Sequence, residues 1–147
     1  MSEMKNFKVE FVERTLKIIK DDKLKTEYEV TLLLNCLLGM ITLPIETTKD
    51  EKSKQIIEDY KTNCINELKL LAKIEIINEQ DDNAFRSIRN SIAHLEITPI
   101  NSNGVISSVK FKDYNDSNKK VLSLTIEVNN LKKFAIYVAE EYLKIIR

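Results

Sequence analysis

The chain has 147 residues, which is enough for one domain with a substantial buried core. Hydrophobic residues make up 43% and charged residues 31%, a balance typical of a globular protein. The 23 basic residues are matched by 23 acidic ones, and this balance argues against a chain that binds nucleic acid or membranes through its overall charge. With only two Gly and two Pro, long loops and β-rich folds are disfavoured and helices are favoured. We therefore expect a single domain over residues 1–147 that is mainly α.

Hydrophobic spacing predicts three helices in the first half of the chain, over residues 5–20, 25–43 and 52–77. Pro44 ends the second of them, and the polar residues 46–51 then form a loop. The third helix is expected to turn six apolar side chains inward: Ile56, Ile57, Tyr60, Cys64, Leu68 and Leu71.

The second half of the chain mixes helical and strand patterns. A polar start at residues 81–83 predicts a fourth helix over 84–95, which Thr98-Pro99 prevents from continuing. Residues 105–114 and 119–128 alternate and are rich in β-branched side chains, so they predict one β-hairpin around "NDSN".

A final helix is predicted from Asn129 or Asn130 to Arg147. The predicted fold class is thus a helical bundle of about five helices with a β-hairpin before the last helix.

The two cysteines, Cys36 and Cys64, lie far apart in apolar surroundings and lack metal-ligand spacing. This usage indicates buried, reduced thiols and a cytoplasmic location. The sequence shows no run long enough to span a bilayer and no signal-peptide pattern, so we expect no membrane partner. We also expect no metal and no cofactor, because no ligand set or phosphate-binding glycine loop can be assembled.

The only histidine of the chain, His94, lies in the fourth predicted helix. At about 100° per residue, Phe85, Ile88, Ile92 and Leu95 fall on one side, which should be the core face. His94 falls nearly opposite that face, Arg89 on one flank, and Asn90 between the two. Read from geometry alone, His94 could be a solvent-facing side chain near a helix C-terminus, where the helix dipole mildly favours a cation.

The stretch "RNSIAH" (Arg89–His94) resembles the signature of the HEPN superfamily, in which an arginine and a polar residue precede a histidine. The late position of this motif among helices agrees with that superfamily. The segment "NCLLGMITLP" and the helix–hairpin–helix ending look like a bacterial branch associated with plasmids and phage defence. The resemblance covers most of the chain from about Tyr28.

The resemblance implies a metal-independent endoribonuclease that acts as a homodimer, with one cleft lined by both protomers. Carried over residue by residue, Arg89 and His94 would be catalytic and Asn90 would support them. The chemistry fits: an imidazole suits the two proton transfers of 2′-OH attack near neutral pH, and a guanidinium can hold two phosphate oxygens. Because one protomer supplies one imidazole, we expect the isolated protomer to be close to inactive.

Two alternatives stay open. A non-catalytic HEPN module would bind RNA or a protein through the same residues. A helical dimerisation protein with a coincidental motif would leave His94 on open surface, away from Arg89. For the ribonuclease we expect a toxin-like or phage-defence effector acting on single-stranded or loop RNA, with an antitoxin or sensor protein as a further partner.

Weaker candidates lie outside the motif. Asn35 could orient Arg89, although an asparagine in an apolar helix more often satisfies a backbone group. A local polyanion patch is most plausible in the lysine-rich stretch after residue 109, for which a solvated hairpin and helix start is the plainer interpretation. Its members are Lys110, Lys112, Lys119, Lys120, Lys132 and Lys133.

Overall fold

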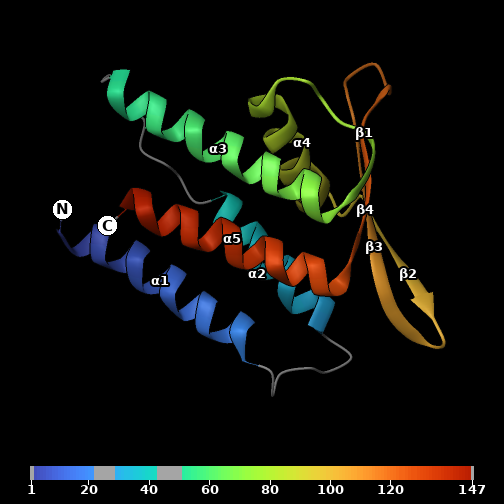
Figure 1. Cartoon of the computed structure of the whole chain (residues 1–147), viewed down its shortest axis with the longest axis horizontal. Helices are drawn as coiled ribbons and strands as arrows, with labels where there is room; N and C mark the ends of the chain where they lie inside the picture. The colour runs from blue at the N-terminus through green and yellow to red at the C-terminus, as the bar shows by residue number, and fades with distance from the viewer. Residues whose placement is uncertain (1, 22–28, 43–50, 147) are drawn as a thin grey trace.

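The computed structural model of the chain describes residues 2–21, 29–42 and 51–146 (Figure 1). The predicted stop at Pro44 and the loop that follows lie outside these residues, except that Glu51 begins a helix. The elements within the described ranges are α1 (Ser2–Lys20), α2 (Glu29–Thr42), α3 (Glu51–Leu71), β1 (Lys73–Ile76), α4 (Asp81–Ala93), β2 (Ile97–Ser102), β3 (Val105–Tyr114), β4 (Lys120–Glu127) and α5 (Val128–Ile146).

The strands form an antiparallel sheet in the order β1-β4-β3-β2. Figure 1 shows this sheet at one edge of the molecule, with all the drawn helices on one side of it and nothing covering the other side. We call these two sides the inner face and the outer face. On the inner face, α4 and the start of α5 contact β3 and β4.

The prediction of a mainly α bundle with one hairpin is therefore wrong: the hairpin of β3 and β4 is present, but it is the centre of a four-stranded sheet in an α/β fold. The strand β1 falls inside the predicted helix 52–77. The last helical hydrogen bond there runs from Ala72 N to Leu68 O, and Ile74 then pairs with Leu124 of β4. Over four residues, strand and helix spacing cannot be told apart.

The strand β2 contains Thr98 and Pro99, which were expected only to end a helix. Proline has no N–H to donate to a ladder, so it is tolerated in strands mainly at an edge. β2 is the edge strand next to β3, with Pro99 opposite Val109.

The core lies between the helices and the inner face. α5 contacts α1, α2 and α3 and buries one apolar stripe against them. The ring of Tyr60 on α3 meets Phe85 of α4 and Tyr142 of α5 edge-on, with centroids 5.7 and 6.1 Å apart. One predicted core residue of α3, Ile56, is instead 44% exposed. Among the described helices, none combines the length and apolar character needed to cross a membrane.

Candidate functional site

The motif lies on α4, which connects one edge strand of the sheet to the other, β1 to β2, and so crosses the inner face. Its buried side carries Phe85, Ile88 and Ile92, as the helical spacing predicts, and Ser91 is fully buried beside them. This side packs on β3, β4, α2 and α3. Contacts with the sheet and with two other helices therefore hold α4 in place, and they also fix the position of its opposite side.

The end of α4 sets the position of His94. The helix begins at Asp81 and ends at Ala93, so His94 is its C-cap residue. Leu95 N–H donates to Ile92 O and Glu96 N–H donates to Ser91 O, the pair of bonds that closes a Schellman motif. Leu95 has a φ of 55°, in the left-handed region that favours glycine.

This geometry corrects the prediction that Leu95 belongs to the core face. Because the helix ends two residues before it, Leu95 leaves the helical spacing and its side chain is 78% exposed. The chain then turns into β2, where Lys112 N–H of β3 donates to Glu96 O at 3.0 Å. His94 is thus placed next to the junction of α4 with the sheet.

The three motif side chains are accessible and unpaired. Arg89 and His94 are exposed and Asn90 is half-buried. Within the part of the chain that the structure describes, none of the three makes a side-chain hydrogen bond or an ion pair. Three accessible polar side chains within one six-residue stretch are therefore free to bind something outside the protomer.

Arg89 belongs to a cationic flank of α4. Asp82, Arg86 and Arg89 follow one another at helical spacing on the same side. Lys61 of α3 donates to Asp82 Oδ1 at 2.6 Å, and Arg86 lies 3.7 Å from Asp82 Oδ2. The hydrogen bond from Lys61 is the main reason that the pKa of the Asp82 carboxyl is lowered, and the charges of Lys61, Arg86 and Arg89 act in the same direction. Two cations thus lie within 4 Å of the Asp82 carboxylate, and the charge of Arg89 acts on it as well.

Sequence reasoning missed Lys61 and Arg86. Arg86 could have been found, because it precedes Arg89 by three residues and so lies on the same helix face. Lys61 could not, because only the packing of α3 against α4 brings it to Asp82.

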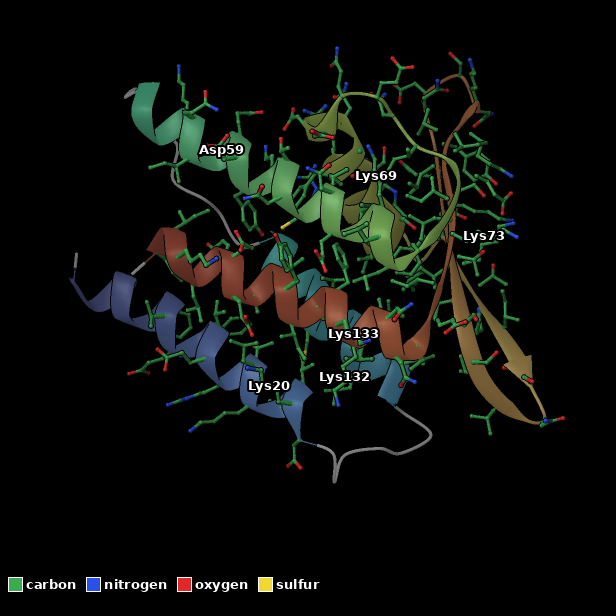
Figure 2. The ribbon with its side chains drawn as sticks, viewed as in Figure 1. Lys20, Asp59, Lys69, Lys73, Lys132 and Lys133 are labelled. Carbon is green, nitrogen blue, oxygen red and sulfur yellow. The ribbon has the colours of Figure 1, made fainter. Side chains whose placement is uncertain are left out.

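The weaker candidates are separated from the motif. Asn35 is exposed on α2 and makes no hydrogen bond with Arg89. The lysine-rich stretch divides between two layers: Lys110, Lys112 and Lys120 are in the sheet and Lys119 in the turn before β4, whereas Lys132 and Lys133 lie on α5. Figure 2 shows Lys132 and Lys133 among the helices and Lys73 at the sheet.

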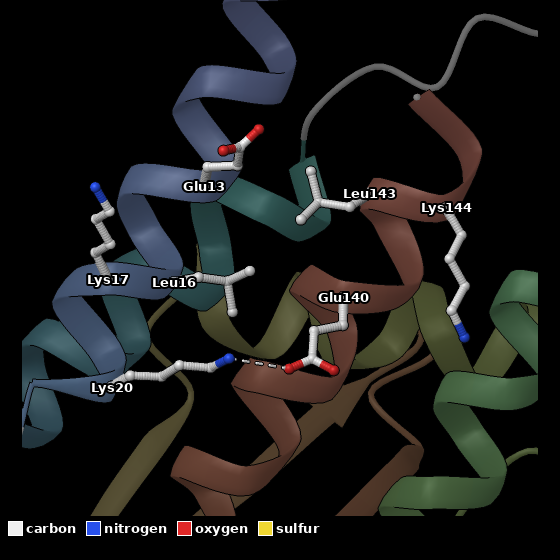
Figure 3. Close-up of a pocket in the computed structure, with 7 residues that line it drawn as sticks. All are labelled: Glu13, Leu16, Lys17, Lys20, Glu140, Leu143 and Lys144. Carbon is white, nitrogen blue, oxygen red and sulfur yellow. Dashed lines mark ion pairs between the residues drawn. The ribbon is translucent and has the colours of Figure 1, made fainter.

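Two grooves between helices lie away from the motif. One groove, of about 470 Å³, lies between α1 and α5 and is bridged by an ion pair of 3.3 Å from Lys20 Nζ to Glu140 Oε1 (Figure 3). A smaller one, of about 190 Å³, lies between α3 and α5. Neither is lined by Arg89, Asn90 or His94. In the single chain, the motif lies on an open helix face.

The family model described as HEPN pEK499 p136 matches residues 1–147. The chain belongs to this HEPN family. The resemblance seen in "RNSIAH" is thereby confirmed at the level of the family. Comparison with curated proteins and with solved structures gave no match.

The remaining chemistry of this HEPN protein is sparse. Across residues 2–21, 29–42 and 51–146, no three His, Cys, Asp or Glu side chains are grouped so that they could hold a metal ion. Both cysteines are free; Cys64 is fully buried as predicted, whereas Cys36, also predicted to be buried, is only half-buried. Burial raises the pKa of the Cys64 thiol to about 12, which makes it a poor nucleophile.

Proposed function

We propose that this HEPN protein is a metal-independent endoribonuclease that acts as a homodimer, with Arg89 and His94 as catalytic residues and Asn90 in support. The observation that carries the proposal is the HEPN family match over residues 1–147 together with the accessible motif residues on α4. They lie on the open side of α4, close to the helix end, and are unpaired within the described residues. Such a site has donors and acceptors available for a substrate.

The reaction requires little beyond these groups. The 2′-OH of a ribose attacks the neighbouring phosphorus, one proton leaves the 2′-oxygen, and another reaches the departing 5′-oxygen. Imidazole can accept and donate protons at neutral pH. The guanidinium of Arg89 is planar and permanently charged, so it can bind two oxygens of the phosphorane-like transition state. The substrate is single-stranded or loop RNA, because in-line attack needs a flexible backbone.

The homodimer follows from the number of groups. One protomer has one imidazole for two proton transfers, and its motif lies on an open face. A two-fold axis beside α4 would bring a second Arg89 and His94 to the opposite wall of a shared cleft. Ala93, a small exposed residue between the motif side chains, leaves room for the two helices to approach.

The cellular part of the proposal is a toxin-like or phage-defence effector in the cytoplasm, with an antitoxin or sensor protein as a partner. It is supported by the resemblance of the motif and of "NCLLGMITLP" to the plasmid-associated branch.

The test is cleavage of a labelled single-stranded RNA in the presence of EDTA. Wild-type protein should cut the RNA and leave 2′,3′-cyclic phosphate ends, and His94→Ala should lower the rate by about 10²–10⁴-fold. Arg14→Ala on α1, which removes an exposed cation far along the chain from the motif, is the matched control and should cut normally. Equal cleavage by wild type and His94→Ala would exclude the assigned role of His94.

A non-catalytic HEPN module is the second candidate, favoured by the open position of the motif in the single chain. It predicts that wild-type protein binds RNA or a protein partner through Arg89 and His94 but never cleaves. Growth on induction separates the two: toxicity that His94→Ala abolishes supports the nuclease.

A further inference from the structure

The outer face of the sheet carries a row of cations. Val109 and Phe111 of β3 are buried against the helices, so Lys110 and Lys112, which alternate with them, point to the outer face. On β4, Leu122, Leu124 and Ile126 face inward in the same way. Thr125 and Ser123 therefore share the outer face with the lysines.

The strand register extends this row across the whole sheet. Lys110 lies opposite Thr125 of β4 on one side and Thr98 of β2 on the other, and Thr125 lies opposite Lys73 of β1. Lys112 lies opposite Ser123. At ordinary strand dimensions, Lys110 and Lys112 are about 7 Å apart along β3 and Lys73 is about 10 Å from Lys110 across β4. Lysines thus alternate with hydroxyl side chains across this face, where Ser123 is buried between its neighbours.

The charges of this row are partly compensated. Lys110 Nζ lies 3.6 Å from Glu75 Oε1, but the Glu75 side chain is 51% exposed, so the pair is weak. Lys73 and Lys112 make no ion pair with any described residue. Glu127 follows Thr125 in the same alternation on β4 and also faces outward, so Lys73, Lys110 and Lys112 exceed the carboxylates of Glu75 and Glu127 by one positive charge.

A buried hydroxyl on the same face lacks a partner. Ser123 is 1% exposed, and its Oγ makes no hydrogen bond within the described residues. Its cross-strand neighbours are Lys112 and Ile76. A buried hydroxyl without a partner costs about 1–3 kcal/mol. An oxygen bound between these side chains would satisfy it.

We infer that the outer face binds the sugar-phosphate backbone of single-stranded RNA, with Lys73, Lys110 and Lys112 on phosphates and the hydroxyls of Ser123 and Thr125 on phosphate or ribose oxygens. Lysine rows that follow a backbone, joined by aromatic rings, are the usual means of holding single strands. Tyr114, 41% exposed at the end of β3, supplies such a ring. The choice of RNA among polyanions rests on the proposed function.

The surface is connected to the motif. Lys112 N–H donates to Glu96 O, two residues after His94. A strand on the outer face can therefore pass around the start of β2 to reach the open side of α4. The outer face holds the RNA that flanks the cut, and α4 makes the cut.

The test measures binding in the His94→Ala background, so that cleavage does not interfere. The probe is a fluorescein-labelled oligouridylate, followed by anisotropy from about 50 to about 200 mM salt. The triple variant Lys73→Gln/Lys110→Gln/Lys112→Gln should bind at least about tenfold more weakly at the low salt, and the slope of log affinity against log salt should fall by about 2, since each phosphate contact on a single strand contributes about 0.7. Ser123→Ala should weaken binding about threefold and leave the slope unchanged, because a hydroxyl carries no charge.

The matched control, Arg14→Gln/Lys17→Gln/Lys69→Gln, removes three exposed cations from α1 and α3. It should change the affinity less than threefold. Equal weakening by the two triple variants, or no binding by the parent protein, overturns the inference. If the wild type cuts RNA but the outer-face triple variant binds as tightly as its parent, the nuclease proposal stands and the outer-face inference fails. If the triple variant loses binding but the wild type does not cut RNA, the outer-face inference stands and the nuclease proposal fails.

Discussion

The two sides of α4 differ in how their residues are used. On the inner side, Phe85, Ile88 and Ile92 are buried against the sheet and α3, and Ser91 Oγ donates to Glu96 O. On the open side, Arg89 and His94 are exposed and neither is paired within the described residues. One side of the thirteen-residue helix α4 therefore contributes to the folded core. The exposed polar side chains on the other side make no such contribution.

This difference indicates which changes should affect stability and which should affect activity. Removing an inner side chain leaves a cavity, whereas removing an open one leaves the fold intact.

The largest expected effect is on cleavage by Arg89→Ala. Losing a preorganised donor to the transition state should lower kcat/KM by about 10²–10³-fold. Arg89→Lys should recover only part of the loss, because an ammonium cannot make the bidentate contact. Arg86→Ala, three residues earlier on the same flank, is the control. If Arg86→Ala lost as much activity as Arg89→Ala, general positive charge rather than the motif would be responsible.

The inner side is tested by Ile88→Ala. Ile88 is 1% exposed, so its truncation should lower the free energy of unfolding by about 2–5 kcal/mol in urea titrations. The folded fraction should still cut RNA at the wild-type rate. A stable but inactive variant would show that the two sides of α4 are not separate.

A substitution at the end of α4 should change the free energy of unfolding by a smaller amount and in the opposite direction. Leu95 holds a φ of 55° with its side chain in solvent, so Leu95→Gly should raise the free energy of unfolding by about 0.5–1 kcal/mol. Ala93→Gly, on the exposed side of the last helical turn, should lower it by about 1 kcal/mol. If Leu95→Gly also destabilised the protein, the left-handed position of Leu95 would be in doubt.

The smallest effect concerns the Lys61–Asp82 pair. The pKa of Asp82 is lowered in the folded protein, chiefly by the hydrogen bond from Lys61, so its contribution to stability is present above the unfolded value near 4 and is lost as the pH falls through the folded pKa. Because the Asp82 side chain is 40% exposed, Asp82→Asn should cost only about 0.5 kcal/mol at neutral pH. The difference between the two proteins should shrink as the pH falls below the unfolded value and disappear below the lowered pKa of Asp82 in unfolding titrations. A difference that grew on acidification would contradict this assignment.

The sequence predicted the parts of this site that depend on helical spacing alone. The burial of Phe85, Ile88 and Ile92 and the exposure of Arg89 follow from 3.6 residues per turn. Leu95 was misplaced because its position depends on where the helix ends, which is set by the left-handed turn into β2.

The features that depend on strand pairing could not be predicted from the sequence. β1 has only four residues and follows a helix without a turn signal, and β2 contains a proline, so neither was predicted. Without these two strands, the sequence could not predict that Lys73 lies near Lys110, nor which side chains share a face of the sheet with the lysines of β3. Local patterns specify single elements, whereas a surface shared by four strands depends on their order.

The most direct test of the shared catalytic cleft uses mixed dimers. Two differently tagged chains, wild type and His94→Ala, are copurified as a heterodimer, and the cleavage rate per dimer is compared with those of both homodimers. If both imidazoles act in one cleft, the heterodimer should cut RNA at close to the rate of the His94→Ala homodimer. Half of the wild-type rate would show that each subunit works alone and would contradict a cleft built from both.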